Sequence, residues 1–183
     1  MDLSKSYKQN VFKEFNLKIR DEFVLLLGSN GSGKSTLIKC ILSLINYEGN
    51  ISIDGLIGYI PENFQFPMYV KVESFIRNLA SITNSEFEAL LVEYDLYEHR
   101  NKYIYALSKG MKQKLVIIQA LVHNPDILIC DEPINGLDLK VKKTFIEMLH
   151  NQKLLGKTIL LSSHYEDMYV DMADKVINLD ETD

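Results

Sequence analysis

The sequence predicts an α/β fold with a mainly parallel sheet, an antiparallel β edge at the N-terminus and a helical insertion subdomain. Short apolar runs alternate with amphipathic segments of helical periodicity, as in parallel strands joined by helices. A glycine-rich turn joins the first apolar run directly to a helical segment. We expect one domain over residues 1–183, with a core formed by residues 1–61 and 115–183 and a helical subdomain at about 62–114.

Each element follows from its local pattern. The first twenty residues alternate loosely and predict the antiparallel edge, whereas residues 21–27 (DEFVLLL) form an apolar run bounded by charge and glycine, typical of a buried strand. Residues 34–44 carry apolar side chains at helical spacing. The same criteria predict helices at 72–82, 85–97, 115–122 and 140–152, and strands at 50–53, 57–60, 127–130, 158–162 and 176–179.

Composition narrows the classes of protein that need considering. The formal net charge is −5, whereas a duplex-binding domain usually carries a basic surface, so we expect no nucleic-acid partner. Cys40 and Cys130 lie far apart in apolar runs, which predicts buried, reduced thiols rather than a disulfide or a zinc site. The start of the sequence lacks the apolar stretch of a signal peptide, and no run is long enough to span a bilayer. We therefore expect a cytoplasmic protein.

A phosphate-binding loop (P-loop) follows the first predicted strand. Residues 28–35, GSNGSGKS, fit the pattern GxxxxGK[ST], with a strand before them and a helix after them. Glycines let the backbone wrap closely, so that its N–H groups point at phosphate oxygens. We expect Lys34 to neutralise the β- and γ-phosphates and Ser35 to ligate Mg²⁺. The predicted nucleotide-binding residues here are Gly28, Ser29, Asn30, Gly31, Ser32, Gly33, Lys34, Ser35 and Thr36.

Two carboxylates end the strand predicted at residues 127–130. Ligands of open α/β sheets bind at the carboxyl ends of the strands, which is where Asp131 and Glu132 stand. We expect Asp131 to hold the Mg²⁺ shell and Glu132 to act as general base on an attacking water. His164 follows the strand at 158–162 and leaves the sheet at the same edge. This position favours a catalytic role near the γ-phosphate.

The stretch ALSKGMKQKL, residues 106–115, places a hydroxyl, a glycine and three lysines at the start of a helix. A helix N-terminus collects backbone N–H groups that favour an anion. Ser108 and the Gly110 backbone are suitable donors for such an anion. Taken alone, the stretch is better explained as an ordinary helix cap flanked by solvated lysines.

The order of these motifs resembles the nucleotide-binding domain of ATP-binding cassette (ABC) transporters over nearly the whole chain. The signature motif of that family is close to LSGGQ and stands here as Leu107-Ser108-Lys109-Gly110-Met111. The resemblance implies that Ser108 and Gly110 contact the ATP held by the P-loop of a partner cassette. It also implies that Asp138, in PINGLD, belongs to the D-loop at the dimer seam. Tyr7 occupies the region where the family places an aromatic that stacks on adenine, with Phe12 as a nearby alternative.

The same resemblance implies partners and a cellular location. We expect ATP and Mg²⁺ as ligands, and a second ATPase subunit, identical or similar, that completes the site. A separate membrane-spanning subunit is expected to dock near residues 64–72, which would place the chain at the inner face of the cell membrane. The apolar residues of that segment also suit the core of the helical insertion, and both uses are compatible.

The sequence departs from the family pattern at three places. Glu62 stands where glutamine is usual; a carboxylate only accepts hydrogen bonds, yet it can still order a water of Mg²⁺ near the nucleotide, and Gln65 is a possible substitute. Lys109 and Met111 replace glycine and glutamine of the signature, a variation similar to that of small bacterial exporter and resistance ATPases, which favours export. The sequence ends soon after the last predicted strand, which indicates a near-minimal cassette.

Other functions remain as alternatives. A soluble ABC ATPase acting in an assembly process shares every motif above and stays open. Chromosome-type members carry long coiled coils, and the insertion has no sustained heptads. An unrelated P-loop kinase or GTPase leaves residues 107–111 without a role. A catalytically inactive regulatory cassette is disfavoured because Glu132 and His164 are both present. The cargo, and the choice between homodimer and heterodimer, are open at this point.

Overall fold

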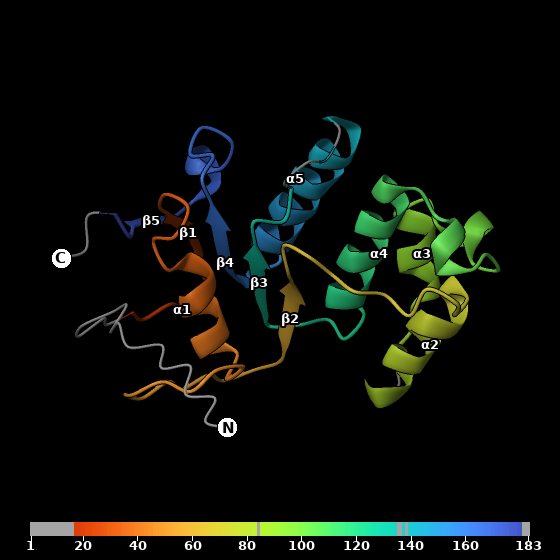
Figure 1. The fold of residues 1–183 in the computed structure, drawn as a ribbon, viewed down its shortest axis with the longest axis horizontal. Coiled ribbons are helices and arrows are strands. Elements are labelled where there is room, and N and C mark those ends of the chain that lie inside the picture. The colour runs from red at the N-terminus through yellow and green to blue at the C-terminus, as the bar shows by residue number, and fades with distance from the viewer. Residues whose placement is uncertain (1–16, 84, 135–136, 138, 181–183) are drawn as a thin grey trace, which may run out of the picture.

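The computed structural model describes residues 17–83, 85–134, 137 and 139–180, and they form a parallel β-sheet with helices on both faces (Figure 1). The sheet has the strand order β2-β3-β4-β1-β5, and every neighbouring pair is parallel. The strands are β1 (Phe23–Leu27), β2 (Ile57–Ile60), β3 (Ile127–Asp131), β4 (Thr158–Ser163) and β5 (Lys175–Asn178).

Alternate residues of the central strands build two separate apolar cores. On one face, Phe23 and Leu25 of β1 join residues of the helices α4 (Lys109–Leu121) and α5 (Leu139–Leu154). On the other face, Val24 and Leu26 pack against α1 (Lys34–Ile41). Because both faces are covered, the strands are continuous apolar runs rather than alternating ones.

The helical insertion lies between β2 and β3. It contains α2 (Val72–Thr83), α3 (Glu88–Glu93), two single 3₁₀ turns at Tyr97–His99 and Ile104–Ala106, and α4; a third 3₁₀ turn, Val170–Met172, precedes β5. Helix α4 packs against β2, α2 and α5, so it joins the insertion to the sheet. None of the helices in the described part of the chain has the length and apolar character needed to span a membrane.

Four sequence predictions differ from the structure. Residues 50–53 form no strand; Ile51 and Ile53 are exposed, and these residues pair with no strand among the described ones. Helix α3 is shorter than the predicted 85–97, since Asp95 adopts a left-handed backbone (φ 55°) that ends the helical path. Cys40 is half-buried, whereas Cys130 is buried as predicted. The predicted antiparallel edge falls mainly on residues 1–16, outside the described residues, and residues 17–20 form no strand.

Candidate nucleotide site

The candidate site lies where β1, β3 and β4 end at one edge of the sheet. Strand register places Asp131 of β3 opposite Ser162 of β4, and Leu27 of β1 opposite Ser163. The next residue along each strand carries the site: Gly28 opens the P-loop, Glu132 follows Asp131, and His164 follows Ser163. Parallel pairing therefore brings together residues more than a hundred positions apart in the sequence.

The P-loop wraps around its own lysine. Gly31 and Gly33 have positive φ angles of 90° and 100°, which only glycine adopts without strain. The buried Lys34 ammonium donates to the carbonyls of Gly28 (2.6 Å) and Ser29 (3.0 Å). Among the described residues, the first-turn amides of α1 have no hydrogen-bond partner, and Gly33 supplies no side-chain cap. These donors and the positive end of the helix form an anion site.

A hydroxyl–carboxylate cluster lies below the loop. Asp131 is buried, and its Oδ1 accepts hydrogen bonds from Ser35 Oγ (3.1 Å) and Ser162 Oγ (2.7 Å). Hard oxygen ligands of this kind suit Mg²⁺, which takes few protein ligands and keeps several waters. The donor set of Ser35 and Asp131 therefore fits a magnesium ion.

Glu132 and His164 form a second cluster beside the first. Glu132 is only 7% exposed, and its Oε2 lies 2.9 Å from His164 Nδ1, while Oε1 lies 3.4 Å from Lys34 Nζ. The Glu132 backbone is left-handed (φ 44°), and its N–H donates to the Ser162 carbonyl and Oγ. Strained backbone of this kind persists where its surroundings fix it, often at functional sites. Glu132 Oε1 is buried, faces the Lys34 ammonium and accepts no hydrogen bond among the described groups.

Burial affects two side chains on the strands that lead to the site, Cys130 on β3 and Tyr59 on β2. Burial first, and then the Asp131 charge, raises the pKa of the Cys130 thiol far above its usual value. Burial, with Asp131 and Glu62 nearby, raises the pKa of Tyr59 to about 12. Cys130 and Tyr59 therefore stay neutral, and the charged groups at this edge are the carboxylates, Lys34 and any bound ligand.

The signature stretch is not brought to this P-loop. Ser108 caps α4 by accepting the Met111 N–H at 3.2 Å, and it is exposed. Figure 1 shows α1, the helix that follows the P-loop, and α4 on opposite sides of β2 and β3. The signature stretch at the start of α4 therefore stands apart from the helix that follows the P-loop of its own chain.

Three predicted site residues are not tested by these contacts. Glu62 follows β2 and is exposed; the structure shows neither a hydrogen bond nor an ion pair from it to Ser35 or Asp131. Tyr7 and Asp138 lie outside the described residues. The roles proposed for these three residues stay predictions.

Two glutamines of α4 link the signature helix to the site edge. Gln113 Nε2 donates to the Pro133 carbonyl (2.9 Å), directly after Glu132, and Gln119 Nε2 donates to the Tyr59 carbonyl (2.6 Å) on β2. These two bonds tie α4 to β2 and to the residue that follows Glu132. The sequence analysis did not select these residues.

Ser162 was also missed by the sequence analysis. It is fully buried, bonds Asp131, and accepts the Glu132 N–H through Oγ (3.1 Å). A serine pair at the end of an otherwise apolar strand was the available signal. Ser162 holds both carboxylate residues in place.

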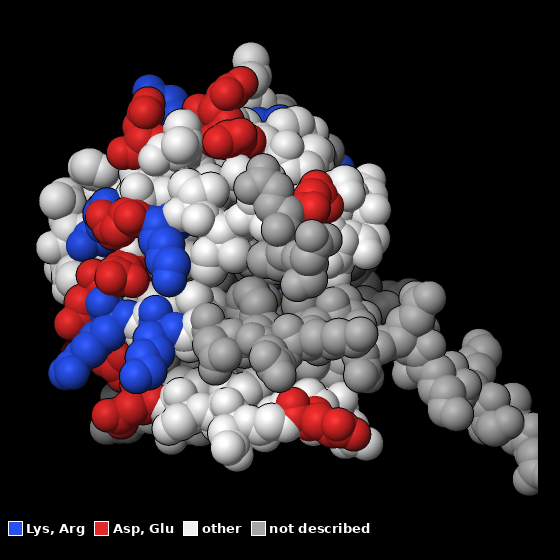
Figure 2. Space-filling model, turned by 90° about the vertical axis from the view of Figure 1, so that its left-hand side faces the viewer, with Lys and Arg blue, Asp and Glu red and all other residues white. Residues whose placement is uncertain are grey.

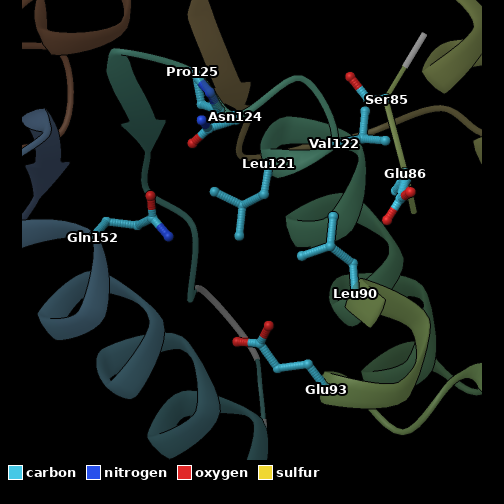
Figure 3. Close-up of a pocket in the computed structure, with 9 residues that line it drawn as sticks. All are labelled: Ser85, Glu86, Leu90, Glu93, Leu121, Val122, Asn124, Pro125 and Gln152. Carbon is cyan, nitrogen blue, oxygen red and sulfur yellow. The ribbon is translucent and has the colours of Figure 1, made fainter. Parts of the chain in front are cut away.

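A cavity and a charged face lie outside the candidate site. A cavity of about 410 Å³ lies between α3, the end of α4 and α5, and none of the predicted site residues lines it (Figure 3). Figure 2 shows the side of the molecule that carries α1 and β5, where Lys and Arg lie beside Asp and Glu over the described part. The described residues of this face therefore form no separate basic patch that would suit a polyanion.

Comparison with known proteins agrees with this geometry. A family model described as ABC transporter matches residues 12–135. An ABC transporter ATP-binding protein of Bacillus subtilis, YthP, is 36% identical and covers 92% of this chain and 75% of its own. The zinc uptake ATP-binding protein ZnuC of the same organism is 33% identical, covering 87% of this chain and 79% of its own.

Solved structures show the same fold. The structure of an ATP-binding subunit of an ABC transporter superposes with a TM-score of 0.85 at 33% identity, covering 95% of this chain and 81% of the other. A dimeric bacterial ABC transporter cassette gives a TM-score of 0.75 at 24% identity, covering 92% and 85%, which shows the fold alone. The family match over most of the chain, together with these relatives, shows that this chain belongs to the ABC transporter family as one of its ATP-binding subunits, and is an ATPase.

Proposed function

We propose that the chain hydrolyses ATP–Mg²⁺ at a site shared by two cassettes and thereby energises a separate membrane-spanning subunit. The observation that supports this most directly is the convergence of Lys34, Ser35, Asp131, Glu132 and His164 at one edge of the sheet. Each of these side chains contacts another member of the group or its immediate neighbour. The group combines a phosphate cradle, a metal-ligand pair and a buried base.

Each group has a distinct chemical role. Ser35 and Asp131 would hold Mg²⁺, which neutralises charge on the β- and γ-phosphates when bound. Lys34 exchanges its carbonyl partners for phosphate oxygens. Glu132 orients a water through the oxygen that now lacks a hydrogen bond, and accepts its proton as the water attacks. His164, held against Glu132, stabilises the transferring phosphoryl group.

A second cassette completes the site. Ser108 and the Gly110 backbone stand at the start of α4 and away from their own P-loop, in an exposed position that a partner's γ-phosphate can reach. Lys109 adds a positive charge to the same surface. Closing two cassettes around ATP therefore supplies the donors that one chain lacks, and hydrolysis removes the phosphate that joins them.

The membrane subunit is proposed to dock on exposed tyrosines beside residues 64–72. Phe64, Phe66 and Phe75 pack on one another at centroid distances of 4.5–6.3 Å, so they fill the core of the insertion. Tyr69 is 85% exposed and lies 5.8 Å from Tyr105, which stacks on Tyr103 at 5.7 Å.

Backbone pairing fixes these rings on neighbouring segments. The Tyr105 N–H donates to the Met68 carbonyl (3.0 Å), and the Ile104 N–H donates to the Val70 carbonyl (3.0 Å). Together Tyr69, Tyr103 and Tyr105, which we call the tyrosine surface, form an exposed aromatic area that suits a partner protein. A chain docked there would sit at the inner face of the membrane.

The direction of transport is proposed from the signature. Lys109 and Met111 favour an exporter. The competing possibility is an importer, since relatives of this chain include ATP-binding proteins of zinc transport and zinc uptake systems. Co-expression with a multi-span membrane protein chosen as candidate partner, followed by a measurement of ATP-driven uptake of the transported compound into inverted vesicles, separates the two. Accumulation inside inverted vesicles indicates export, and its absence with retained ATPase activity contradicts it.

The docking proposal is tested by co-purification with that membrane subunit. Replacing Tyr69 and Tyr105 together by alanine should abolish co-purification while the affinity for ATP is retained. Tyr47→Ala, which removes a 39%-exposed tyrosine elsewhere, is the matched control. Co-purification of the double variant at the wild-type level would contradict the proposed surface. Full ATPase activity with no membrane partner at all would favour the soluble assembly ATPase.

A further inference from the structure

Asp174 and Asp180, which flank β5, accept backbone N–H groups near the two ends of β1. At the start of β1, Asp174 Oδ2 accepts the Phe23 N–H at 2.8 Å. Beyond its end, Asp180 Oδ2 accepts the Ser29 N–H at 2.7 Å, and Asp180 Oδ1 accepts the Ser29 hydroxyl at 2.9 Å. Asp180 therefore accepts hydrogen bonds from Ser29, the second residue of the P-loop, with both of its carboxylate oxygens.

The position of Asp180 follows from the sheet. Asn178 pairs with Leu27 at the end of β1, and the Leu179 N–H continues the ladder by donating to the Leu27 carbonyl (2.9 Å). The Asp180 N–H donates to Asn178 Oδ1 at 3.1 Å, which turns the chain beside Ser29. Asp180 is thus placed by the strand that flanks the P-loop.

Ser29, which bonds Asp180, also accepts a hydrogen bond from the P-loop lysine, Lys34. The carbonyls of Gly28 and Ser29 accept the Lys34 ammonium, and Ser29 belongs to both contacts. A chain of hydrogen bonds therefore runs from Asp180 through Ser29 to Lys34. Since its N–H is already engaged, Ser29 leaves phosphate binding to the amides further along, at the start of α1.

We propose that Asp180 is a positioning residue for nucleotide binding. It acts through Ser29, by fixing the entry of the P-loop so that Lys34 and the first-turn amides are preorganised for phosphate. This rests on the proposed role of the P-loop. Asp180 and Ser29 are both exposed, so the contact adds little to global stability and its effect is confined to the loop. Without the Asp180 contact, the entry of the P-loop must be ordered when nucleotide binds. This ordering costs free energy, so the affinity for nucleotide falls.

The test is the affinity for ADP–Mg²⁺, measured by isothermal titration calorimetry on the full chain, beside the melting temperature of each variant. Asp180→Ala should weaken binding roughly five- to ten-fold, as expected for losing hydrogen bonds to a charged group, with an unchanged melting temperature. Asp180→Asn should restore binding to within about two-fold, because the amide oxygen still accepts the Ser29 N–H. Ser29→Ala, which removes one of the two bonds, should fall between them.

Asp174→Ala is the control: it removes a carboxylate that accepts a backbone N–H at the opposite end of β1, together with its ion pair to Lys153. It should lower the melting temperature and leave the affinity for ADP–Mg²⁺ unchanged. An Asp180→Ala variant that binds as well as the wild type, or more tightly, would overturn the inference while leaving the proposed function intact. A wild-type chain that binds no nucleotide would overturn the proposed function itself.

Discussion

Ser162→Ala should destabilise the protein, because Ser162 is fully buried and its hydroxyl bonds a buried carboxylate. Its Oγ donates to the buried Asp131 carboxylate at 2.7 Å and accepts the Glu132 N–H at 3.1 Å. The first bond involves a charged group, and its loss costs about 2 kcal/mol. The second loss is smaller, because the Glu132 N–H keeps the Ser162 carbonyl at 3.2 Å.

The loss should appear in urea unfolding and as a fall of roughly 4–8 °C in melting temperature for a chain of this size. Ser163→Ala is the control on the same strand: Ser163 is almost as deeply buried, but among the described residues its Oγ bonds the neutral Tyr165 N–H at 2.9 Å and no carboxylate. That variant should lose about 1 kcal/mol. If Ser162→Ala were no more destabilising than Ser163→Ala, the claim that Ser162 supports the carboxylate would be refuted.

Two further predictions concern groups outside the catalytic cluster. The Lys153 hydrogen bond, and then the Phe23 N–H, lower the pKa of Asp174, so its contribution to stability is present above the ordinary carboxyl range and lost as pH falls through the lowered pKa. The difference in unfolding free energy between wild type and Asp174→Asn should therefore shrink from pH 7 to pH 3, and a constant difference in urea titrations would contradict this. Cys130 is fully buried and Cys40 half-buried, so a thiol reagent should label Cys40 in the native protein and Cys130 only after unfolding, as mass spectrometry of the labelled peptides would show.

The local sequence pattern was sufficient to predict a strand where that strand is buried on both faces of the sheet. Apart from Thr158 at the start of β4, the runs that became β1, β3 and β4 are apolar up to the carboxyl edge, so the continuous apolar run alone defined them. The segment 50–53 has the same composition as a strand, but a strand needs a partner, and local sequence does not say whether one exists.

The site divides in the same way. The P-loop with Lys34, and the pair Asp131-Glu132, are each formed by consecutive residues, so both motifs could be recognised in the sequence. The structure brings the two motifs into contact. Ser162 and Asp180 act through strand register, which pairs residues far apart in sequence. Neither has a local signature that separates it from an ordinary serine or aspartate.

The central claim is a site shared between two cassettes, and Glu132→Gln tests it most directly. The substitution keeps the shape of the buried side chain and removes the base, so it should retain ATP–Mg²⁺ and trap any closed dimer. Size-exclusion chromatography with light scattering, run with and without ATP–Mg²⁺, gives the mass of the species. The account predicts a monomer without nucleotide and a dimer with it, and predicts that Ser108→Ala in the same background weakens the dimer. A variant that binds ATP yet remains monomeric would contradict a site completed by a second copy of this chain.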